Sequence, residues 1–331
     1  MIFSRRSALA GAGLLAAAAV SLGGMSAAQA ETKWDMPTPY GESNFHTQNI
    51  LAFAQDIEDK TGGSLSIQVH SAGSLFKHPE IKNAVRKGLA PIGELLISRL
   101  SNEDPVFGVD SVPFLANSYD SAFKLYQASK PALEEKLSAQ GLKLLYTVPW
   151  PPQGIYSKKD INTIDDLKGL KFRAYNASTE RLAQLAGAVP TQVEVADLPT
   201  AFSTGRVEAM ITSPSTGANS KAWDYLDHYY DTQAWLPKNM VIVNASAFDA
   251  LSAEEQAAVL DAAAEAETRG WEASKTETDE QTQILSDNGI TVAAPSEALL
   301  SAMKEIGDTM TAEWAESAGD EGGAIVKAFL D

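Results

Sequence analysis

Segments with strand-like and helix-like hydrophobic patterns alternate along almost the whole chain. Residues 49–63, NILAFAQDIEDKTGG, carry apolar side chains at helical spacing and end at a glycine pair, which is typical of a helix terminus. Residues 64–70, SLSIQVH, then alternate polar and apolar side chains as a strand does. The alternation continues as far as the strand-like NGITVAAP at residues 288–295. This pattern predicts an α/β fold with mostly parallel sheets.

The length of the chain, 331 residues, exceeds what one hydrophobic core usually organises, so we expect two lobes. No low-complexity linker divides the sequence, which indicates that the chain crosses between the lobes more than once. The expected crossings are the strand-like LKLLYTVPWPPQGIYS, residues 142–157, and MVIVNASAF, residues 240–248. The predicted organisation is a leader at residues 1–30, a first lobe at 31–150 plus about 237–275, and a second lobe at 151–236 plus about 276–331.

The first 30 residues have the three parts of an export signal. They are MIFSRRSALAGAGLLAAAAVSLGGMSAAQA, with a basic start, an apolar middle and small residues at the end. We expect cleavage after AQA, a mature chain that begins at Glu31, and a periplasmic location. A membrane anchor is the alternative, but the apolar run is short, rich in alanine and interrupted at residues 21–24. The SRR start at residues 4–6 resembles a twin-arginine signal, so this route and the general secretory (Sec) route both stay open.

A large excess of acidic side chains restricts the partners of the mature chain. The net charge is -17, and it becomes -19 when the leader, with two arginines and no acidic residue, is removed. This charge repels nucleic acids and anionic lipid, because binding to phosphates needs basic patches. No stretch after the leader is long and apolar enough to span a membrane. We therefore expect no nucleic-acid partner and no stable membrane insertion, although a local positive cluster can still hold a small anion.

The residue types that most enzymes and metalloproteins use are scarce. The chain has no cysteine, which excludes disulfides, thiolate nucleophiles and cysteine-ligated metals. Its four histidines have no partners at metal-ligand spacing; they are His46, His70, His78 and His228. The sequence contains neither a GxSxG nucleophile motif nor a phosphate-binding loop. We therefore expect a protein that is not an enzyme and that uses no metal or cofactor.

One arginine lies at the end of a short apolar strand. In LKFRAY, Arg173 shares a face with Lys171 and Tyr175 and lies near the carboxyl end of the strand. Ligands of open α/β sheets bind in the crevice beyond these ends. Asn176 or Ser178 then begins the next helix, whose free N–H groups favour anions. Arg173 can therefore bind a carboxylate through two parallel hydrogen bonds, and the alternative is a surface ion pair with an acidic residue.

Three stretches of the chain resemble the solute-binding proteins of tripartite ATP-independent periplasmic (TRAP) transporters, the DctP-like family. They are TGGSLSIQVHSAGSLFKHPEIKNAVRKG, DLKGLKFRAYNASTERLAQLAGAVPTQVEVADLPTAFSTGRVEAM and LSAEEQAAVLDAA. The resemblance covers nearly the whole mature chain. It implies two α/β lobes around a ligand cleft, crossing strands, a long bridging helix, and closure on a small organic acid. It also places the family's ligand-clamping arginine at Arg173.

Other candidate ligand-binding residues follow strands or crossings. The family often has Asn-Pro after the strand that is VEAMIT here, and this chain has Ser213-Pro214, so Ser213 is the expected polar contact. Trp150 and Gln153 lie on the first crossing segment, with hinge packing as the alternative for Trp150. Trp235 precedes the second crossing, where tryptophans are commonly structural.

The turn before the first helix and one buried-looking carboxylate complete the candidates. Phe45 and His46 lie at this turn, and helix capping is the alternative role for their neighbours Ser43 and Asn44. Glu94 interrupts the apolar run PIGELLIS, so it either contacts a polar group of the ligand or pairs with a nearby base. The predicted ligand-binding residues are Arg173, Ser213, Asn176, Trp150, Glu94, Phe45, His46, Gln153 and Trp235.

These features predict an exported protein that binds a small carboxylate or a sulfonate by hinge closure. We expect a monomer that delivers this ligand to the membrane permease subunits of a TRAP-type transporter. The aromatic residues near the expected cleft favour an acid with a ring or an apolar chain, and the expected ligand is a carboxylate such as an aromatic or hydroxy acid. The alternatives are a binding protein of an ATP-driven importer, a ligand-sensing subunit, and an exported enzyme that uses cleft carboxylates.

Overall fold

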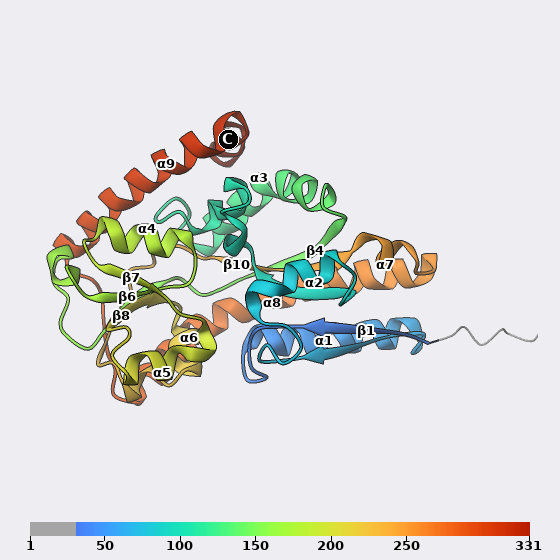
Figure 1. Cartoon of the computed structure of the whole chain (residues 1–331), viewed down its shortest axis with the longest axis horizontal. Helices are drawn as coiled ribbons and strands as arrows, with labels where there is room; N and C mark the ends of the chain where they lie inside the picture. The colour runs from blue at the N-terminus through green and yellow to red at the C-terminus, as the bar shows by residue number, and fades with distance from the viewer. Residues whose placement is uncertain (1–30) are drawn as a thin grey trace, which may run out of the picture. The chain divides into compact units, whose positions relative to one another are not determined.

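The computed structural model describes residues 31–331, so the predicted export signal lies outside the described residues. Strands and helices alternate through the described chain, which confirms the expected α/β fold (Figure 1). The strands form separate sheets in two lobes, and short crossing segments join these lobes. Among residues 31–331, every helix is too short or too polar to cross a membrane.

The first lobe contains a parallel pair of strands beside an antiparallel group of three. Strand β10 lies at the centre of this group and pairs with β3 and β4, while β1 pairs with β2 and packs beside β3. Its strands are β1 (Thr32–Pro37), β2 (Leu65–His70), β3 (Ile92–Leu96), β4 (Leu142–Pro149) and β10 (Lys238–Asn244). Its helical segments are α1 (Phe45–Thr61), η1 (His78–Glu80), α2 (Ile81–Arg86), η2 (Ile97–Leu100), η3 (Pro105–Ser111), α3 (Tyr119–Ser138) and α7 (Ala245–Asp249).

The second lobe contains a six-stranded sheet in the order β11-β9-β5-β8-β6-β7. Its strands are β5 (Gly154–Ser157), β6 (Lys171–Ala174), β7 (Val189–Gln192), β8 (Ala209–Thr212), β9 (His228–Tyr230) and β11 (Thr291–Ala293). Its helical segments are η4 (Ile164–Leu167), α4 (Ala177–Leu185), η5 (Val195–Asp197), α5 (Leu198–Ser203), α6 (Pro214–Asn219) and η6 (Ala222–Asp224). Figure 1 shows α4 on one side of β6, β7 and β8, with α5 and α6 on the other.

Among residues 31–331, four of the eight strand pairs are antiparallel, so the expectation of mostly parallel sheets was wrong. Strand β6 runs parallel to both of its neighbours, β7 and β8, as strand–helix–strand units require. In contrast, β5 is antiparallel to β8 and β9, and β10 is antiparallel to β3 and β4. The reason is connectivity: β5 and β10 are the strands that directly follow a crossing, so they enter their sheets from the other lobe.

Two crossing segments lie side by side between the lobes. The backbone N–H of Trp150 donates to the carbonyl of Pro237 at 2.8 Å, and that of Gln153 donates to the carbonyl of Trp235 at 3.0 Å. The first crossing lies within residues 142–157, as expected. The return crossing precedes residue 238, so the segment named as the crossing strand, residues 240–248, instead forms part of β10 in the first-lobe sheet and, after Asn244, helix α7.

Two long helices contact both lobes. Helix α8 (Ala253–Asp287) begins at a Ser252–Glu255 capping box and packs on α1 and β4 of the first lobe and on α6 and β11 of the second. Helix α9 (Glu297–Leu330), which changes direction at Gly319, contacts α3 and η3 as well as α4 and η4. Helix α8 is thus the bridging helix that the family resemblance implies. The residue limits assigned to the lobes stay a prediction, because residues 31–331 form one unit by their contacts.

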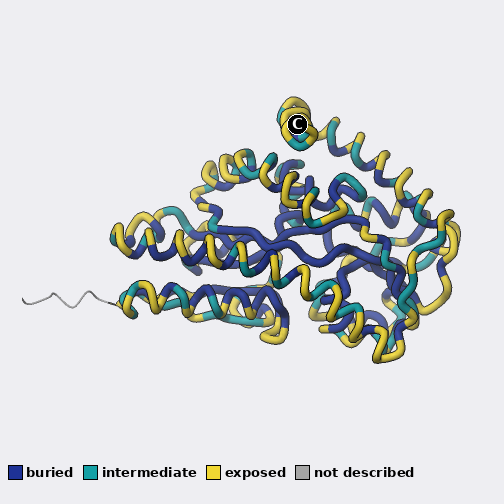
Figure 2. The backbone as a smooth tube through the Cα atoms, turned by 180° about the vertical axis from the view of Figure 1, so that it is seen from behind, coloured by how far each residue is buried: buried dark blue, intermediate teal, exposed yellow. Residues whose placement is uncertain are grey.

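The sheets and crossing segments form the buried interior, and the outer faces of the helices are exposed (Figure 2). One continuous apolar cluster extends from Met36 in the first lobe through Trp150 and Trp235 at the crossings to Phe172 in the second lobe. The two lobes are therefore packed against each other in this structure, with the crossings at the centre of the contact.

Candidate functional site

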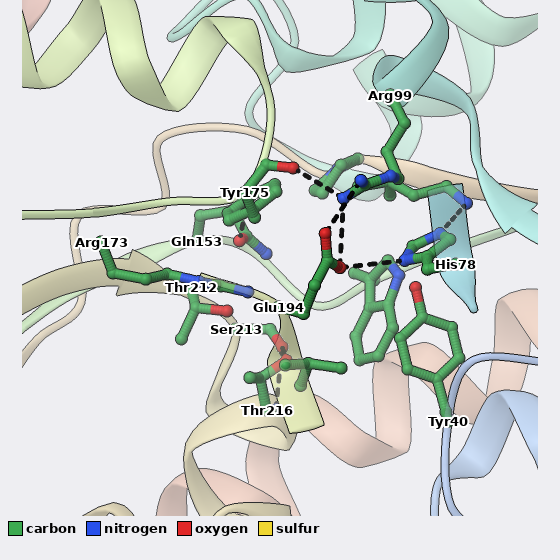
Figure 3. A pocket seen from close by; sticks show the side chains of 14 residues that line it. Tyr40, His78, Arg99, Gln153, Arg173, Tyr175, Glu194, Thr212, Ser213 and Thr216 are labelled. Carbon is green, nitrogen blue, oxygen red and sulfur yellow. Dashed lines mark hydrogen bonds and ion pairs between the residues drawn. The ribbon is translucent and has the colours of Figure 1, made fainter. Parts of the chain in front are cut away.

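A small cavity lies where the two lobes and the two crossing segments meet (Figure 3). The space inside it that the centre of a water molecule can reach is about 40 Å³, so it suits a compact ligand. The first lobe contributes Tyr40, His78, Leu96 and Arg99, and the crossings contribute Trp150, Gln153 and Pro237. The second lobe contributes Arg173, Tyr175, Glu194, Val195, Thr212, Ser213 and Thr216.

Arg173 is a buried cation without an anionic partner in the described chain. It comes from β6, is 4% exposed, and points into the cavity (Figure 3). Its Nε donates to the carbonyl of Val193 at 3.0 Å, and its guanidinium lies 4.6 Å from the centre of the Tyr175 ring. Burial lowers the pKa of Arg173 to about 10, so it stays charged at neutral pH. A buried unpaired charge is costly, which makes this guanidinium a ready site for an anion.

A second arginine reaches the cavity from the first lobe and is already paired. Arg99, on η2, donates from Nη2 to Oε1 of Glu194 at 2.9 Å and from Nη1 to Oε2 at 3.3 Å. Its Nη1 also donates to the carbonyl of Tyr175 at 3.1 Å. Glu194 and Tyr175 both belong to the second lobe, so this bidentate ion pair joins the lobes across the cavity.

His78 lies beside this ion pair as a neutral ring. Its Nε2 accepts the backbone N–H of Leu96 at 3.1 Å, which assigns the ring proton to Nδ1. Nδ1 lies 3.9 Å from Oε2 of Glu194. Burial, reinforced by the charges of Arg99 and Arg173, holds the pKa of His78 well below its usual range. His78 therefore adds no positive charge to the cavity at neutral pH.

Polar side chains from the second lobe and the first crossing line the rest of the cavity. Ser213 caps α6, because its Oγ accepts the backbone N–H of Thr216 at 3.1 Å, and it also donates to Oγ1 of that residue at 3.2 Å. The hydroxyl of Tyr175 donates to Oε1 of Gln153 at 3.0 Å. These contacts fix hydroxyl and amide groups around the space that Arg173 faces.

Tyr40 and Trp150 form the aromatic wall of the cavity, and a buried hydrogen-bond network on the far side of this wall fixes their orientation. The indole N–H of Trp150 donates to Oδ1 of Asn239 at 2.9 Å, and the hydroxyl of Tyr40 donates to the same oxygen at 3.3 Å. Nδ2 of Asn239 donates to Glu94 at 2.9 Å, and the hydroxyl of Thr38 donates to Glu94 at 2.6 Å. Burial raises the pKa of Glu94 to about 7. Glu94 thus orients the two aromatic side chains through Asn239.

Four of the nine predicted residues line the cavity: Arg173, Ser213, Trp150 and Gln153. The other five lie outside this lining: Asn176, Glu94, Phe45, His46 and Trp235. Phe45 and His46 pack on Trp150, with ring centres 5.6 and 4.3 Å from its ring. Asn176 caps α4 through its Oδ1, and its Nδ2 donates to Oγ of Ser98 in the first lobe at 2.8 Å. Trp235 is fully buried in the return crossing.

Sequence reasoning missed several residues that line the cavity. Arg99 and Glu194 carried the same signal as Arg173, since each is a charged side chain just after a strand, in GELLISRL and VPTQVE. Tyr175 is two residues beyond Arg173 on the same face of the strand. Tyr40 lies in the bend after β1 and His78 begins η1, and no pattern in the sequence connects either position with the cavity.

Two α/β lobes that close on a small cavity with an unpaired buried cation define a solute-binding protein for a compact anion. A model of the bacterial extracellular solute-binding protein family 7, DctP, matches residues 39–317. The chain therefore belongs to this family. It is an extracytoplasmic solute-binding protein of the TRAP type, and a binding protein of an ATP-driven importer is not favoured.

Three solved structures are similar to this chain over nearly its whole length. DctP7 of Bordetella pertussis, an extracytoplasmic solute receptor binding pyroglutamic acid, is 47% identical, with a TM-score of 0.90, and the match covers 91% of this chain and 100% of that one. DctP6 of the same organism, also binding pyroglutamic acid, is 46% identical, with a TM-score of 0.89 and coverages of 90% and 99%. A marine metagenome TRAP protein specific for pyroglutamate is 42% identical, with a TM-score of 0.89 and coverages of 91% and 99%.

Proposed function

We propose that this protein captures pyroglutamate, the cyclic lactam of glutamate, and delivers it to the membrane permease of a TRAP transporter. The observation that carries the proposal is the unpaired, buried guanidinium of Arg173 in this small cavity. Pyroglutamate has one carboxylate on a five-membered ring, together with one amide N–H and one amide carbonyl. Three similar structures bind this compound.

The residues around the cavity match the parts of this ligand. Arg173 can donate two parallel hydrogen bonds to the carboxylate, and such charge-assisted bonds are each worth about 1.5–3 kcal/mol. The rings of Tyr40 and Trp150, whose centres are 5.0 Å apart, offer an apolar wall to the lactam ring. Gln153 and the hydroxyl groups of Thr212, Ser213 and Thr216 surround the space as candidate partners for the lactam amide. The ligand thus places a negative charge where the cavity is positive and neutral polar groups elsewhere.

The proposal also covers the export of the protein, its oligomeric state and the fate of the bound ligand. We infer that residues 1–30 direct export by the Sec or twin-arginine route and are then removed. The mature receptor acts as a monomer outside the cytoplasm and releases its ligand chemically unchanged. Incubation of the mature chain with pyroglutamate, followed by NMR of the ligand, tests the last point, because a change in the ligand spectrum over hours would indicate an enzyme.

The test of the ligand is a binding experiment on residues 31–331 with pyroglutamate, measured by thermal unfolding and calorimetry. A ligand at about a hundred times its Kd adds about 2.7 kcal/mol to the free energy of unfolding, which raises Tm by several degrees. We expect Arg173→Ala to abolish this increase without changing the fold. Arg181→Ala is the matched control, because Arg181 is an exposed arginine that pairs with Glu313.

Three outcomes separate the parts of the proposal. Unchanged affinity in the Arg173→Ala variant would show that the carboxylate binds elsewhere. Binding of a different organic acid, lost in the same variant, would keep the site and replace the ligand. Mass spectrometry of the denatured wild-type protein identifies any ligand that remains bound after purification, so an occupied cavity is not mistaken for a failure to bind.

A further inference from the structure

The cavity contains more charged groups than a single carboxylate ligand needs. Two guanidinium groups, Arg173 and Arg99, line it together with one carboxylate, Glu194. Glu194 makes a bidentate ion pair with Arg99, whereas no acidic side chain in residues 31–331 lies within ion-pair distance of Arg173. The lining of the cavity therefore carries two positive charges and one negative charge, and the negative charge of Glu194 is paired with Arg99.

The remaining ionisable groups do not change this balance. His78 is neutral, because its Nε2 accepts the N–H of Leu96 and burial holds its pKa well below the usual range. Behind the wall, Lys238 lies 3.6 Å from Asp110, so these opposite charges offset each other. Burial raises the pKa values of Tyr40 and Tyr175, so both phenols stay protonated. The lining thus presents one uncompensated positive charge at neutral pH.

We propose that Glu194 is a specificity-determining residue that restricts the site to monocarboxylates. It neutralises Arg99, which would otherwise be a second anchor for an anion at the other end of the ligand. A dicarboxylate can place one carboxylate on Arg173, but its second carboxylate then enters a buried space without a free cation. Burial of an unpaired charge is strongly unfavourable. A ligand with one carboxylate and a neutral polar end, such as a lactam, avoids this cost.

The same ion pair could instead act only as a latch, because Arg99 belongs to the first lobe and Glu194 to the second. The two roles make different predictions. A latch stabilises the closed state for every ligand, so its loss weakens all ligands by the same factor. Charge selection changes the ratio of the affinities for monocarboxylates and dicarboxylates. The inference rests on the proposed function, since it assumes that Arg173 binds a carboxylate.

The experiment measures Kd values for pyroglutamate, succinate and glutarate by calorimetry on residues 31–331. In the wild type we expect pyroglutamate to bind at least about tenfold more tightly than either dicarboxylate. In Glu194→Gln, which keeps the size of the side chain and frees the charge of Arg99, we expect this preference to fall at least about tenfold. Glu313→Gln is the matched control, because Glu313 makes a two-point pair with Arg181 on an exposed surface, and it should leave the preference unchanged.

A double variant, Arg99→Gln with Glu194→Gln, removes both charges and restores the balance of one positive charge. Charge selection predicts that the preference for pyroglutamate returns in this variant, whereas a latch predicts weak binding of all three ligands. The inference is overturned if wild type binds succinate or glutarate as tightly as pyroglutamate, a result that needs no variant. It is also overturned if Glu194→Gln weakens all ligands equally. If the wild-type protein binds no carboxylate, or binds one equally well without the Arg173 side chain, the proposed function itself is contradicted.

Discussion

Arg173 and Glu94 are both buried ionisable residues near the cavity, and burial disfavours the charged form of each, but only Glu94 loses its charge near neutral pH. Burial lowers the pKa of Arg173 only to about 10, so the guanidinium stays charged at neutral pH. Burial raises the pKa of Glu94 to about 7, despite the hydrogen bonds from Thr38 and Asn239. The carboxyl group that orients the aromatic wall is therefore partly protonated near neutral pH, and its negative charge competes less with a bound carboxylate.

The raised pKa of Glu94 predicts that the stability of the folded protein depends on pH. The folded-state pKa of about 7 lies above the ordinary value of 4.5, so between these pH values the folded chain keeps a proton that the unfolded chain has lost. The free energy of unfolding should therefore fall by about 3 kcal/mol as pH rises through this window. Urea unfolding of wild type and Glu94→Gln between pH 4 and pH 8 measures it, with the variant expected to lose this component.

The comparison of the two profiles separates Glu94 from His78 but not from His46. The pKa values of His46 and His78 are lowered by burial, so both residues destabilise the fold as pH falls. Nδ1 of His46 lies 3.5 Å from Oε1 of Glu94, so the difference between the wild-type and variant curves reports Glu94 together with its contact to His46. Parallel curves across the window would show that the pKa of Glu94 does not change on folding.

The sequence identified residues of the site where local pattern was sufficient. Arg173 lies near the end of a strand, Ser213 follows a strand, and Trp150 and Gln153 lie on a crossing, so chain position alone pointed to them. Hydrophobic periodicity indicates which face of a strand a residue lies on, but not how far the residue lies from the ligand. This explains why Glu94 was predicted to contact the ligand, although it lies behind the wall formed by Tyr40 and Trp150. The pairing of Arg99 with Glu194 joins segments from different lobes, and no local pattern contains that information.

At the scale of elements, the position of the bridging helix α8 depends on its close approach to β4 and α1 at Gly270. A Cβ on Gly270 would lie 2.4 Å from Cγ2 of Val148 on β4 and 2.8 Å from Nδ2 of Asn49 on α1. The absence of a side chain therefore allows the helix to lie directly on the first-lobe sheet and beside α1. This contact fixes the position of the helix relative to the strand that leads into the first crossing.

Gly270→Ala should destabilise the protein, because the added methyl group forces the helix away from Val148 and Asn49. Overpacking of this kind typically costs about 1–3 kcal/mol. Gly323→Ala is the matched control, since Gly323 lies on α9, is exposed, and has no atom within 4 Å of an added Cβ. The control should be neutral or slightly stabilising, because alanine is the better helix former. Thermal unfolding of the three proteins measures this, and an equal Tm for both variants would contradict the packing argument.

The sequence predicted most elements of the fold correctly but not all of their details. Helix α3 continues through Pro131 as one helix, although a proline usually interrupts the helical hydrogen bonds. The strand expected at residues 240–248 ends at Asn244, whose side chain caps α7. Strand direction was the larger error, since it follows from how the chain crosses between lobes and not from the pattern of any one segment.

At the scale of the whole molecule, three polar side-chain contacts join the lobes beside the apolar packing at the crossings. Arg99 pairs with Glu194 in the cavity lining, whereas outside this lining Asn176 donates to Ser98 at 2.8 Å and Ser43 donates to Asn219 at 3.2 Å. All three contacts join groups that must separate when the lobes open. Hydrogen bonds between polar groups that can return to water contribute little net free energy, so an open state is accessible when no ligand bridges the lobes.

Ligand binding should therefore change the dimensions of the whole molecule. We expect pyroglutamate to decrease the radius of gyration of residues 31–331, as measured by small-angle X-ray scattering, because the anion on Arg173 stabilises the closed state. The Arg173→Ala variant should keep the larger radius at the same ligand concentration. Identical scattering with and without a bound ligand would show that the protein stays closed and that entry does not require lobe movement.

The position of β10 in the first-lobe sheet has a consequence for the order in which the protein can fold. This strand lies between β3 and β4, although it is synthesised after the second-lobe strands β5 to β9. The first lobe therefore cannot complete its sheet from the nascent N-terminal half, and its central pairing waits for a distant segment of the chain. Pairings between distant segments slow folding, so the chain remains incomplete until residue 244 is available. A late central strand therefore delays the completion of the first-lobe core until most of the chain is present.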